Sequence, residues 1–117
     1  MSNRLGWIRS RCRAGEKILD IGSASGFTFR GTELEPHVTF VDLDLYDMPN
    51  FLQMDAHHLT LPDQAYDVAI LGDILEHVDD PVQVIREARR RGSAHAPPSR
   101  RGVPRRRREA VAKTTND

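Results

Sequence analysis

The chain has 117 residues, of which 38% are hydrophobic and 29% are charged, so it is long enough for one small globular domain and too short for two. No apolar run approaches the ~20 residues of a membrane helix, and the first residues lack the pattern of a secretory signal. The single cysteine, Cys12, excludes a disulfide scaffold and a zinc ribbon. We therefore expect a cytoplasmic protein without a membrane segment.

The net charge of zero is divided between two unlike parts of the chain. Residues 1–85 carry six basic and 14 acidic side chains, a net charge of −8, whereas residues 86–117 carry 11 and three, a net charge of +8. Beyond residue 91 there is no aromatic side chain, and too little apolar area to offset the entropy of ordering the segment. The sequence predicts a partial domain at 1–91 and a disordered tail, rich in Arg, Pro and Ala, at 92–117.

Residues 1–91 alternate between helix-like and strand-like stretches. A short leading helix is predicted at 3–11. Strands are predicted where runs are apolar and rich in β-branched or aromatic side chains, at 17–22, 38–42, 51–55 and 67–72. Only eight residues separate the second strand from the third, too few for a helical crossover. We expect an extended loop there, or a later start of the third strand.

Two further stretches differ in how strongly they favour a helix. Residues 26–35 are a poor candidate, because Gly31 interrupts them and Pro36 follows. Asp80 as N-cap and Pro81 as first residue open a stronger helix. Val82, Ile85 and Arg89 follow along one side of this helix. Strands that alternate with helical stretches predict an α/β fold with a partial, doubly wound parallel sheet.

An aspartate closes each predicted strand or lies just beyond it. These residues are Asp20, Asp42, Asp55 and Asp73. The carboxyl ends of parallel strands share one edge, where ligands bind, and four acids there repel one another unless a ligand with donors satisfies them. The alternative interpretation is that they form turns and helix caps. The sequence leaves both interpretations open.

A glycine-bearing loop follows the first predicted strand. Gly22 and Gly26 allow a ligand to approach the backbone closely. Their spacing is not the G-x-G-x-x-G of dinucleotide sites, and the loop lacks the lysine of a P-loop. These differences argue against NAD and ATP. Asp42, 16 residues after Gly26, stands where a carboxylate accepts ribose hydroxyls in mononucleotide folds.

Several segments resemble successive motifs of the class I S-adenosylmethionine-dependent methyltransferases, in particular the type 11 or UbiE-like group. They are ILDIGSASG at 18–26, FVDL at 40–43, MDA at 54–56, LPD at 61–63 and DVAILGDILEHV at 67–78. The resemblance covers residues 17–91. It implies a Rossmann-like fold, S-adenosylmethionine as cofactor, and methyl transfer to an acceptor that the sequence does not identify.

The resemblance also implies a role for individual residues. Asp20, Gly22 and Gly26 would shape the pocket for the methionine part of the cofactor, and Asp42 would hold the ribose hydroxyls. Asp55 would accept the adenine amino group, with Ala56 contributing its backbone, and Asp73 would lie near the reacting methyl group. Ser23 and Leu43 complete the expected cofactor-binding set.

Other positions near these motifs are not included in the expected cofactor-binding set. Ala24 replaces a glycine of the family, which is tolerable if its φ is negative. Glu76 and His77 are the nearby candidates for a general base, without an assigned catalytic residue. His57 and His58 are interpreted as solvated rather than as metal ligands.

The resemblance fails after residue 91, because the family's fifth to seventh strands have no counterpart. The strand at 67–72 would then have an unpaired edge, open to another chain. Three explanations remain: a truncated or frame-shifted methyltransferase, a half-domain completed by a partner, or a cofactor-binding module with a basic arm. In the last case the run Arg105 to Arg108 would bind nucleic acid without specificity, since no aromatic side chain accompanies it.

Overall fold

The computed structural model describes residues 4–72 and 74–97. Helices, 3₁₀ turns and strands follow one another in this order: α1 (Arg4–Ser10), β1 (Ile18–Ile21), η1 (Glu35–His37), β2 (Val38–Asp42), β3 (Phe51–Gln53), β4 (Val68–Leu71), η2 (Leu75–His77), α2 (Pro81–Arg91) and β5 (Ser93–His95). The predicted leading helix and the predicted strands are confirmed, each within a few residues. Residues 98–117 lie outside the described part, and with them most of the predicted tail and its nucleic-acid arm.

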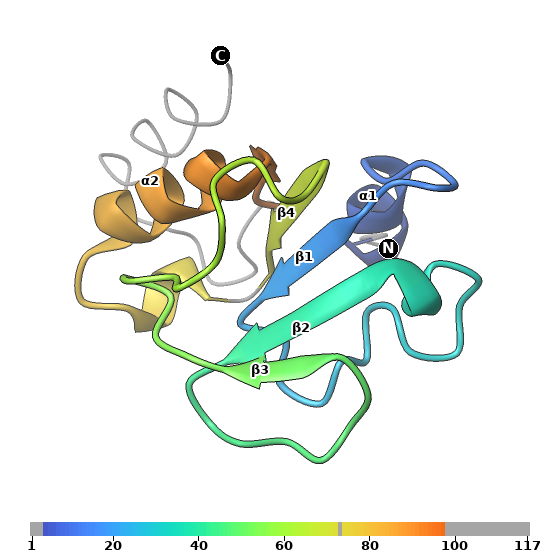
Figure 1. Cartoon of the computed structure of the whole chain (residues 1–117), viewed down its shortest axis with the longest axis horizontal. Coiled ribbons are helices and arrows are strands. Elements are labelled where there is room, and N and C mark those ends of the chain that lie inside the picture. Colours follow the sequence, from blue (N-terminus) through green and yellow to red (C-terminus); the bar gives the residue numbers. More distant parts are fainter. Residues whose placement is uncertain (1–3, 73, 98–117) are drawn as a thin grey trace.

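The five strands form one parallel sheet in the order β3-β2-β1-β4-β5 (Figure 1). The chain builds the sheet outward from β1 to β3 on one side, and then returns to the other side of β1 with β4. The carboxyl ends of β1 and β4 are therefore the point at which the strand order reverses. Open α/β sheets bind ligands at this point.

Alternating side chains place one apolar cluster on each face of the sheet. On one face, Leu19 and Leu71 pack with Val84 and Ile85 of α2. On the other face, strand residues such as Ile18, Phe40 and Ile70 pack with Ile8 of α1 and with Phe29. The two α-helices thus cover opposite faces of the sheet (Figure 1). Asp20 follows Ile18 by two residues in β1, so both side chains point to the same face of the sheet, the face that α1 covers.

The connections agree with the sequence in two places. Residues 22–34 form turns without an α-helix, as the poor helix candidate predicted. Residues 43–50 connect the parallel strands β2 and β3 as an extended loop that ends at Asn50 with φ +60°. No helix in the described part of the chain is long and apolar enough to span a membrane.

Helix α2 begins as predicted, and its buried face includes charged residues. The Asp80 side chain caps the helix by accepting the Gln83 N–H at 3.1 Å. The buried side chains are Val84, Ile85, Glu87, Ala88 and Arg91, whereas Val82 and Arg89, which the sequence placed on the same side as Ile85, are only partly buried. Two charged residues on the buried face pair with each other, which an apolar pattern does not reveal.

The predicted unpaired edge of β4 is wrong, because β5 occupies it. Val68 pairs with Ser93 and Ile70 with His95 in parallel register. Gly92 makes this return possible: a Cβ there would lie 2.6 Å from the carbonyl oxygen of Tyr66. A partner chain at the β4 edge is therefore excluded by the chain's own strand. Strand β5 also lies inside the segment that the sequence assigned to the disordered tail.

Candidate functional site

A cavity of about 460 Å³ opens at the carboxyl edge of the sheet. The segments that follow β1, β2, β3 and β4 all contribute to its wall, as expected for a ligand site at a reversal of strand order. Its volume falls within the range of small-molecule pockets, roughly 300–1,000 Å³.

The structure brings most of the predicted site residues to this cavity. The wall includes Asp20, Gly22, Ser23, Asp42, Leu43, Asp55 and Ala56. Gly26 does not line it, and Asp73 lies outside the described residues. Three of the four strand-end carboxylates therefore share one hollow, although they lie up to 35 residues apart in the sequence.

Asp20 is the most unusual group in the cavity. Its side chain is only 3% exposed, and its Oδ2 atom has no hydrogen-bond partner among the described residues. Burial, and secondly the negative charge of Asp42, raises the pKa of this carboxyl to about 7. Buried polar atoms in proteins are almost always paired, so Asp20, which lies in the cavity wall, carries an unusual unsatisfied acceptor.

Backbone hydrogen bonds hold the loop after β1 in a tight bend. The N–H groups of Gly22 and Ser23 both donate to the carbonyl of Val41, at 2.8 and 3.0 Å. Gly22 has φ +72°, and a Cβ there would lie 2.8 Å from the Cβ of Ile74. The space beside Gly22 is therefore filled by Ile74. Gly26 has φ +77° and packs against Met48, so it shapes the bend without lining the cavity.

Ala24 adopts a conformation opposite to the one that the sequence argument required. Its φ is +49°, in the left-handed region where a side chain is unfavourable. The Ala24 N–H donates to Oδ2 of Asp42 at 2.8 Å, a charge-assisted bond that helps to hold this conformation. The substitution of alanine for the family's glycine therefore strains the backbone.

Asp42 forms turns and also lies on the cavity wall. Its Oδ2 accepts the Ala24 N–H, and its Oδ1 accepts the Asp44 N–H at 3.0 Å, so the residue forms turns. It also lines the cavity beside Asp20. Because each carboxylate oxygen can accept more than one hydrogen bond, Asp42 keeps acceptor capacity for a ligand.

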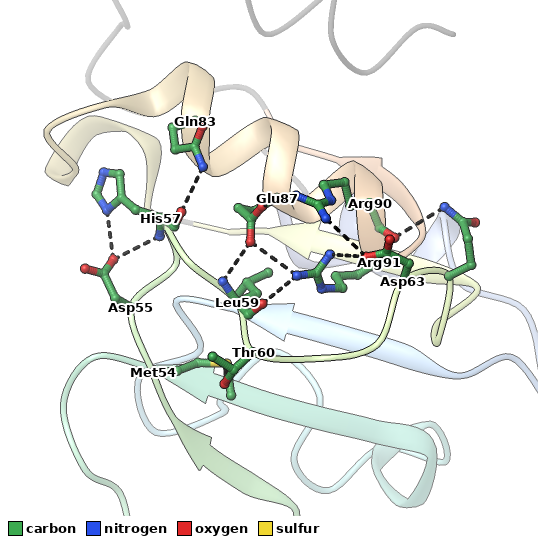
Figure 2. Close-up of polar contacts among 11 residues, drawn as sticks. Met54, Asp55, His57, Leu59, Thr60, Asp63, Gln83, Glu87, Arg90 and Arg91 are labelled. Carbon is green, nitrogen blue, oxygen red and sulfur yellow. Dashed lines mark hydrogen bonds and ion pairs between the residues drawn. The ribbon is translucent and has the colours of Figure 1, made fainter.

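Asp55 is held by His57 rather than lying free. Its Oδ1 accepts the backbone N–H of His57 at 2.9 Å and contacts Nδ1 of the same residue at 2.8 Å (Figure 2). These hydrogen bonds, first the backbone one, lower the pKa of Asp55. The interpretation of His57 as solvated is wrong, since Nε2 also accepts the Asp80 N–H at 3.1 Å. Residues 4–72 and 74–97 hold no group of three or more His, Cys, Asp or Glu suited to a metal ion.

A buried ion cluster anchors the segment that follows Asp55 to α2. Glu87 accepts the Leu59 N–H at 2.8 Å, and Arg91 donates to the Leu59 carbonyl (Figure 2). Arg91 also pairs with Asp63 at 2.9 Å and with Glu87 at 3.3 Å. Glu87 and Arg91 are each 4% exposed. The cluster therefore ties the segment at 59–63, which follows the cavity residues 54–57, to the helix.

Sequence reasoning missed the apolar part of the wall. Phe27, Tyr46, Met54, Ile74 and Val78 line the cavity together with Leu43. Phe27 and Leu43 are 61% and 66% exposed, which is unusual for large apolar side chains. Leu43 was predicted, whereas Phe27 lies six residues after the end of β1 and carries no local signal. Of the two candidate bases, His77 lines the cavity and Glu76 does not.

Comparison with known proteins identifies the family. The methyltransferase domain model matches residues 19–92. A ubiquinone biosynthesis O-methyltransferase of Marinobacter nauticus is 32% identical over an alignment of 101 residues, covering 71% of this chain and 42% of that protein. A relative with the same description from Pseudomonas savastanoi is 31% identical, over 71% of this chain and 43% of that protein. The chain thus spans less than half the length of these curated relatives.

A solved structure has the same fold. The crystal structure of the YcgJ protein of Bacillus subtilis matches with a TM-score of 0.63 at 25% identity, over 76% of this chain and 45% of that protein. The matched domain model covers more than half of the present sequence and includes β1, β2, β3, β4 and α2. The chain therefore belongs to the type 11 family of methyltransferase domains.

Proposed function

We propose that this chain binds S-adenosylmethionine and serves in methyl transfer from that cofactor to an acceptor. The family supports the reaction class, and the cavity supports the cofactor. The single observation that carries the proposal is the buried, unpartnered Oδ2 of Asp20 on the same cavity wall as Asp42. A cationic donor beside Asp20 would relieve both its desolvation and its repulsion by Asp42.

The residues present fit the chemical groups of this cofactor. Asp20 suits an ammonium group, since it offers a buried acceptor without a donor. Asp42 can accept from ribose hydroxyls with the capacity left by its two backbone contacts. Asp55 can accept from an adenine amino group, and the apolar side chains of Leu43 and Met54 can flank the base.

The chain's own part in the reaction is to bind and orient. S-adenosylmethionine supplies an electrophilic methyl group on a sulfonium, which a nucleophile can displace in line. Positioning of the two reactants can supply roughly 7–11 kcal/mol of the acceleration. The name of the curated relatives suggests a hydroxyl acceptor, which must lose a proton. His77, on the cavity wall, is our candidate for this step.

Binding of the demethylated product, S-adenosylhomocysteine, tests the proposal. The full chain should show a rise in its melting temperature at millimolar ligand, because binding to the native state alone stabilises it. Asp42→Ala should abolish this rise. Asp47→Ala is the matched control, since Asp47 lies in the loop that follows Asp42 and outside the cavity wall, and it should respond like the wild type. A wild-type chain with no thermal shift would contradict the proposal.

Two other expectations remain predictions. A cytoplasmic location follows from the sequence argument alone. Nucleic-acid binding through Arg105 to Arg108 depends on residues outside the described part of the chain.

A further inference from the structure

His57 links the loop after β3 to the beginning of α2. Its side chain contacts Oδ1 of Asp55 through Nδ1 at 2.8 Å and the backbone N–H of Asp80 through Nε2 at 3.1 Å. Its carbonyl accepts from Nε2 of Gln83 at 3.0 Å (Figure 2). The imidazole is therefore bound at both ring nitrogens, between a cavity residue and the N-cap of a helix.

These contacts determine the tautomer of the ring. A backbone N–H can only donate, so Nε2 of His57 must be the acceptor from Asp80. The proton of a neutral imidazole then resides on Nδ1, from which it is donated to Asp55. Because this His57 is neutral, it orients the Asp55 carboxylate without cancelling its negative charge.

The first turn of α2 gives this arrangement a rigid base. Asp80 contributes its N–H to His57, while its side chain caps the helix at Gln83. Gln83 in turn holds the His57 carbonyl. Sites supported by regular secondary structure keep their geometry better than sites on free loops. Asp55 itself lies in a loop, with its side chain 56% exposed, so it depends on such support.

We propose that His57 is a positioning residue that sets the preference of the cavity for a purine with an amino group over a purine with a carbonyl group. By holding Oδ1 of Asp55, it orients the carboxylate so that Oδ2 can accept from an exocyclic amino donor of the base. A carbonyl at the same position offers no donor and faces a negative charge. This inference rests on the proposed cofactor site and adds a residue and a specificity to it.

The experiment compares S-adenosylhomocysteine with S-inosylhomocysteine, in which the exocyclic amino group is replaced by a carbonyl and the adjacent ring nitrogen N1 carries a proton. Calorimetry of the full chain is carried out at pH 8, above the ordinary pKa of histidine. The wild type should prefer the amino ligand by about tenfold or more, the range for a hydrogen bond to a charged group. His57→Ala should reduce this preference several-fold, and His57→Asn, whose amide can still donate to Asp55, should recover part of it.

His58→Ala is the matched control, because His58 is the exposed neighbour in the same dipeptide and its ring makes no described hydrogen bond to Asp55. It should keep the wild-type preference. If His57→Ala weakens both ligands equally, His57 is only a structural support and the inference is wrong. A wild type that binds both ligands equally also overturns it. A wild type that binds neither ligand refutes the proposed cofactor site itself.

A measurement without ligand covers the case in which His57→Ala does not fold. The imidazole ¹⁵N shifts of the wild-type chain should show His57 as the Nδ1–H tautomer and His58 as an averaged, solvated ring. An Nε2–H tautomer, or averaging at His57, would overturn the inference, since the two hydrogen bonds that define it would be absent.

Discussion

At Asp20, burial and an unsatisfied acceptor occur in the same side chain. A carboxyl in this position is more stable protonated, so its pKa is raised to about 7. Below the ordinary pKa of aspartate, about 3.9, both the folded and the unfolded chain carry the proton. Between that pH and pH 7 only the folded state keeps the proton, and above pH 7 neither state carries it. The stability that Asp20 contributes is thus complete at low pH and is lost as pH rises to 7.

Asp20→Asn should remove this pH dependence. The amide is uncharged at every pH, so the free energy of unfolding should not decline between pH 4 and pH 7 through this group. The wild type should lose up to about 4 kcal/mol over that interval from Asp20. Urea denaturation at a series of pH values measures the difference, with Asp47→Asn as an exposed control. Equal pH slopes in the wild type and Asp20→Asn would contradict the burial argument.

Ala24→Gly should stabilise the chain. The left-handed conformation of Ala24 is unfavourable by about 1–2 kcal/mol for a residue with a side chain, and part of the gain is offset by the greater freedom of glycine in the unfolded state. We expect a net increase of up to about 1 kcal/mol in the free energy of unfolding. Ala65→Gly is the control, because Ala65 is not among the positive-φ residues. It should destabilise, and equal effects at both positions would count against backbone strain at Ala24.

Helix α2 is connected to the segment at 59–63 by Glu87 and Arg91, whose charged side chains the solvent hardly reaches. Glu87 bonds to the Leu59 N–H and to Arg91, and Arg91 also reaches Asp63. A buried ion pair contributes little net stability, because both charges lose hydration on folding. Removal of one partner is costly, because the other charge stays buried with fewer partners. The segment at 59–63 therefore depends on the complete cluster.

Glu87→Ala should lower the free energy of unfolding by about 1–3 kcal/mol, because the buried Leu59 N–H loses its acceptor and Arg91 keeps Asp63 but loses its buried carboxylate partner. Arg90→Ala, in the same turn of α2, removes a side chain that is 60% exposed. It should change stability by less than about 1 kcal/mol. Chemical denaturation of both variants measures the contrast. If Arg90→Ala lowered the free energy of unfolding as much as Glu87→Ala, the loss of charge rather than the burial of the side chain would decide the effect.

The sequence predicted those elements whose signal is local. The apolar runs around Ile18, Val38 and Val68 identified the central strands, and Asp80 with Pro81 identified the start of α2. Strand β5 was missed because Ser93–His95 has no β-branched or aromatic residue. It forms because α2 delivers the chain to the edge of β4, where Gly92 fits closely against Tyr66. That cause is tertiary, so no local pattern shows it.

The same distinction applies to the candidate site. The carboxylates were predictable, since parallel strands bring their carboxyl ends to one edge. The hydrogen bond from the Asp80 N–H to the His57 ring joins residues 23 positions apart. The Ile74 side chain beside Gly22 comes from the segment that follows β4. The positive φ of Ala24 also depends on its bond to Asp42. These contacts arise from packing between distant segments.

In the whole molecule, the parallel sheet brings five aspartates of the described residues, three of them at strand ends, to one cavity at the point where the strand order reverses. The fold thereby concentrates negative charge where a cationic ligand would be bound most strongly. The chain spans 42% of the Marinobacter nauticus relative. Within that part, the described residues supply the carboxylates, the glycine bend and the apolar wall of the proposed cofactor site.

The pH dependence of S-adenosylhomocysteine binding, measured by calorimetry in buffers of different ionisation enthalpy, tests this account most directly. Because Asp20 must give up its proton to hold an ammonium group, the affinity should rise by close to tenfold per pH unit below about 7 and level off above it, with release of a proton. Asp20→Asn should bind weakly, without this rise. Wild-type binding that is independent of pH and releases no proton would contradict the account.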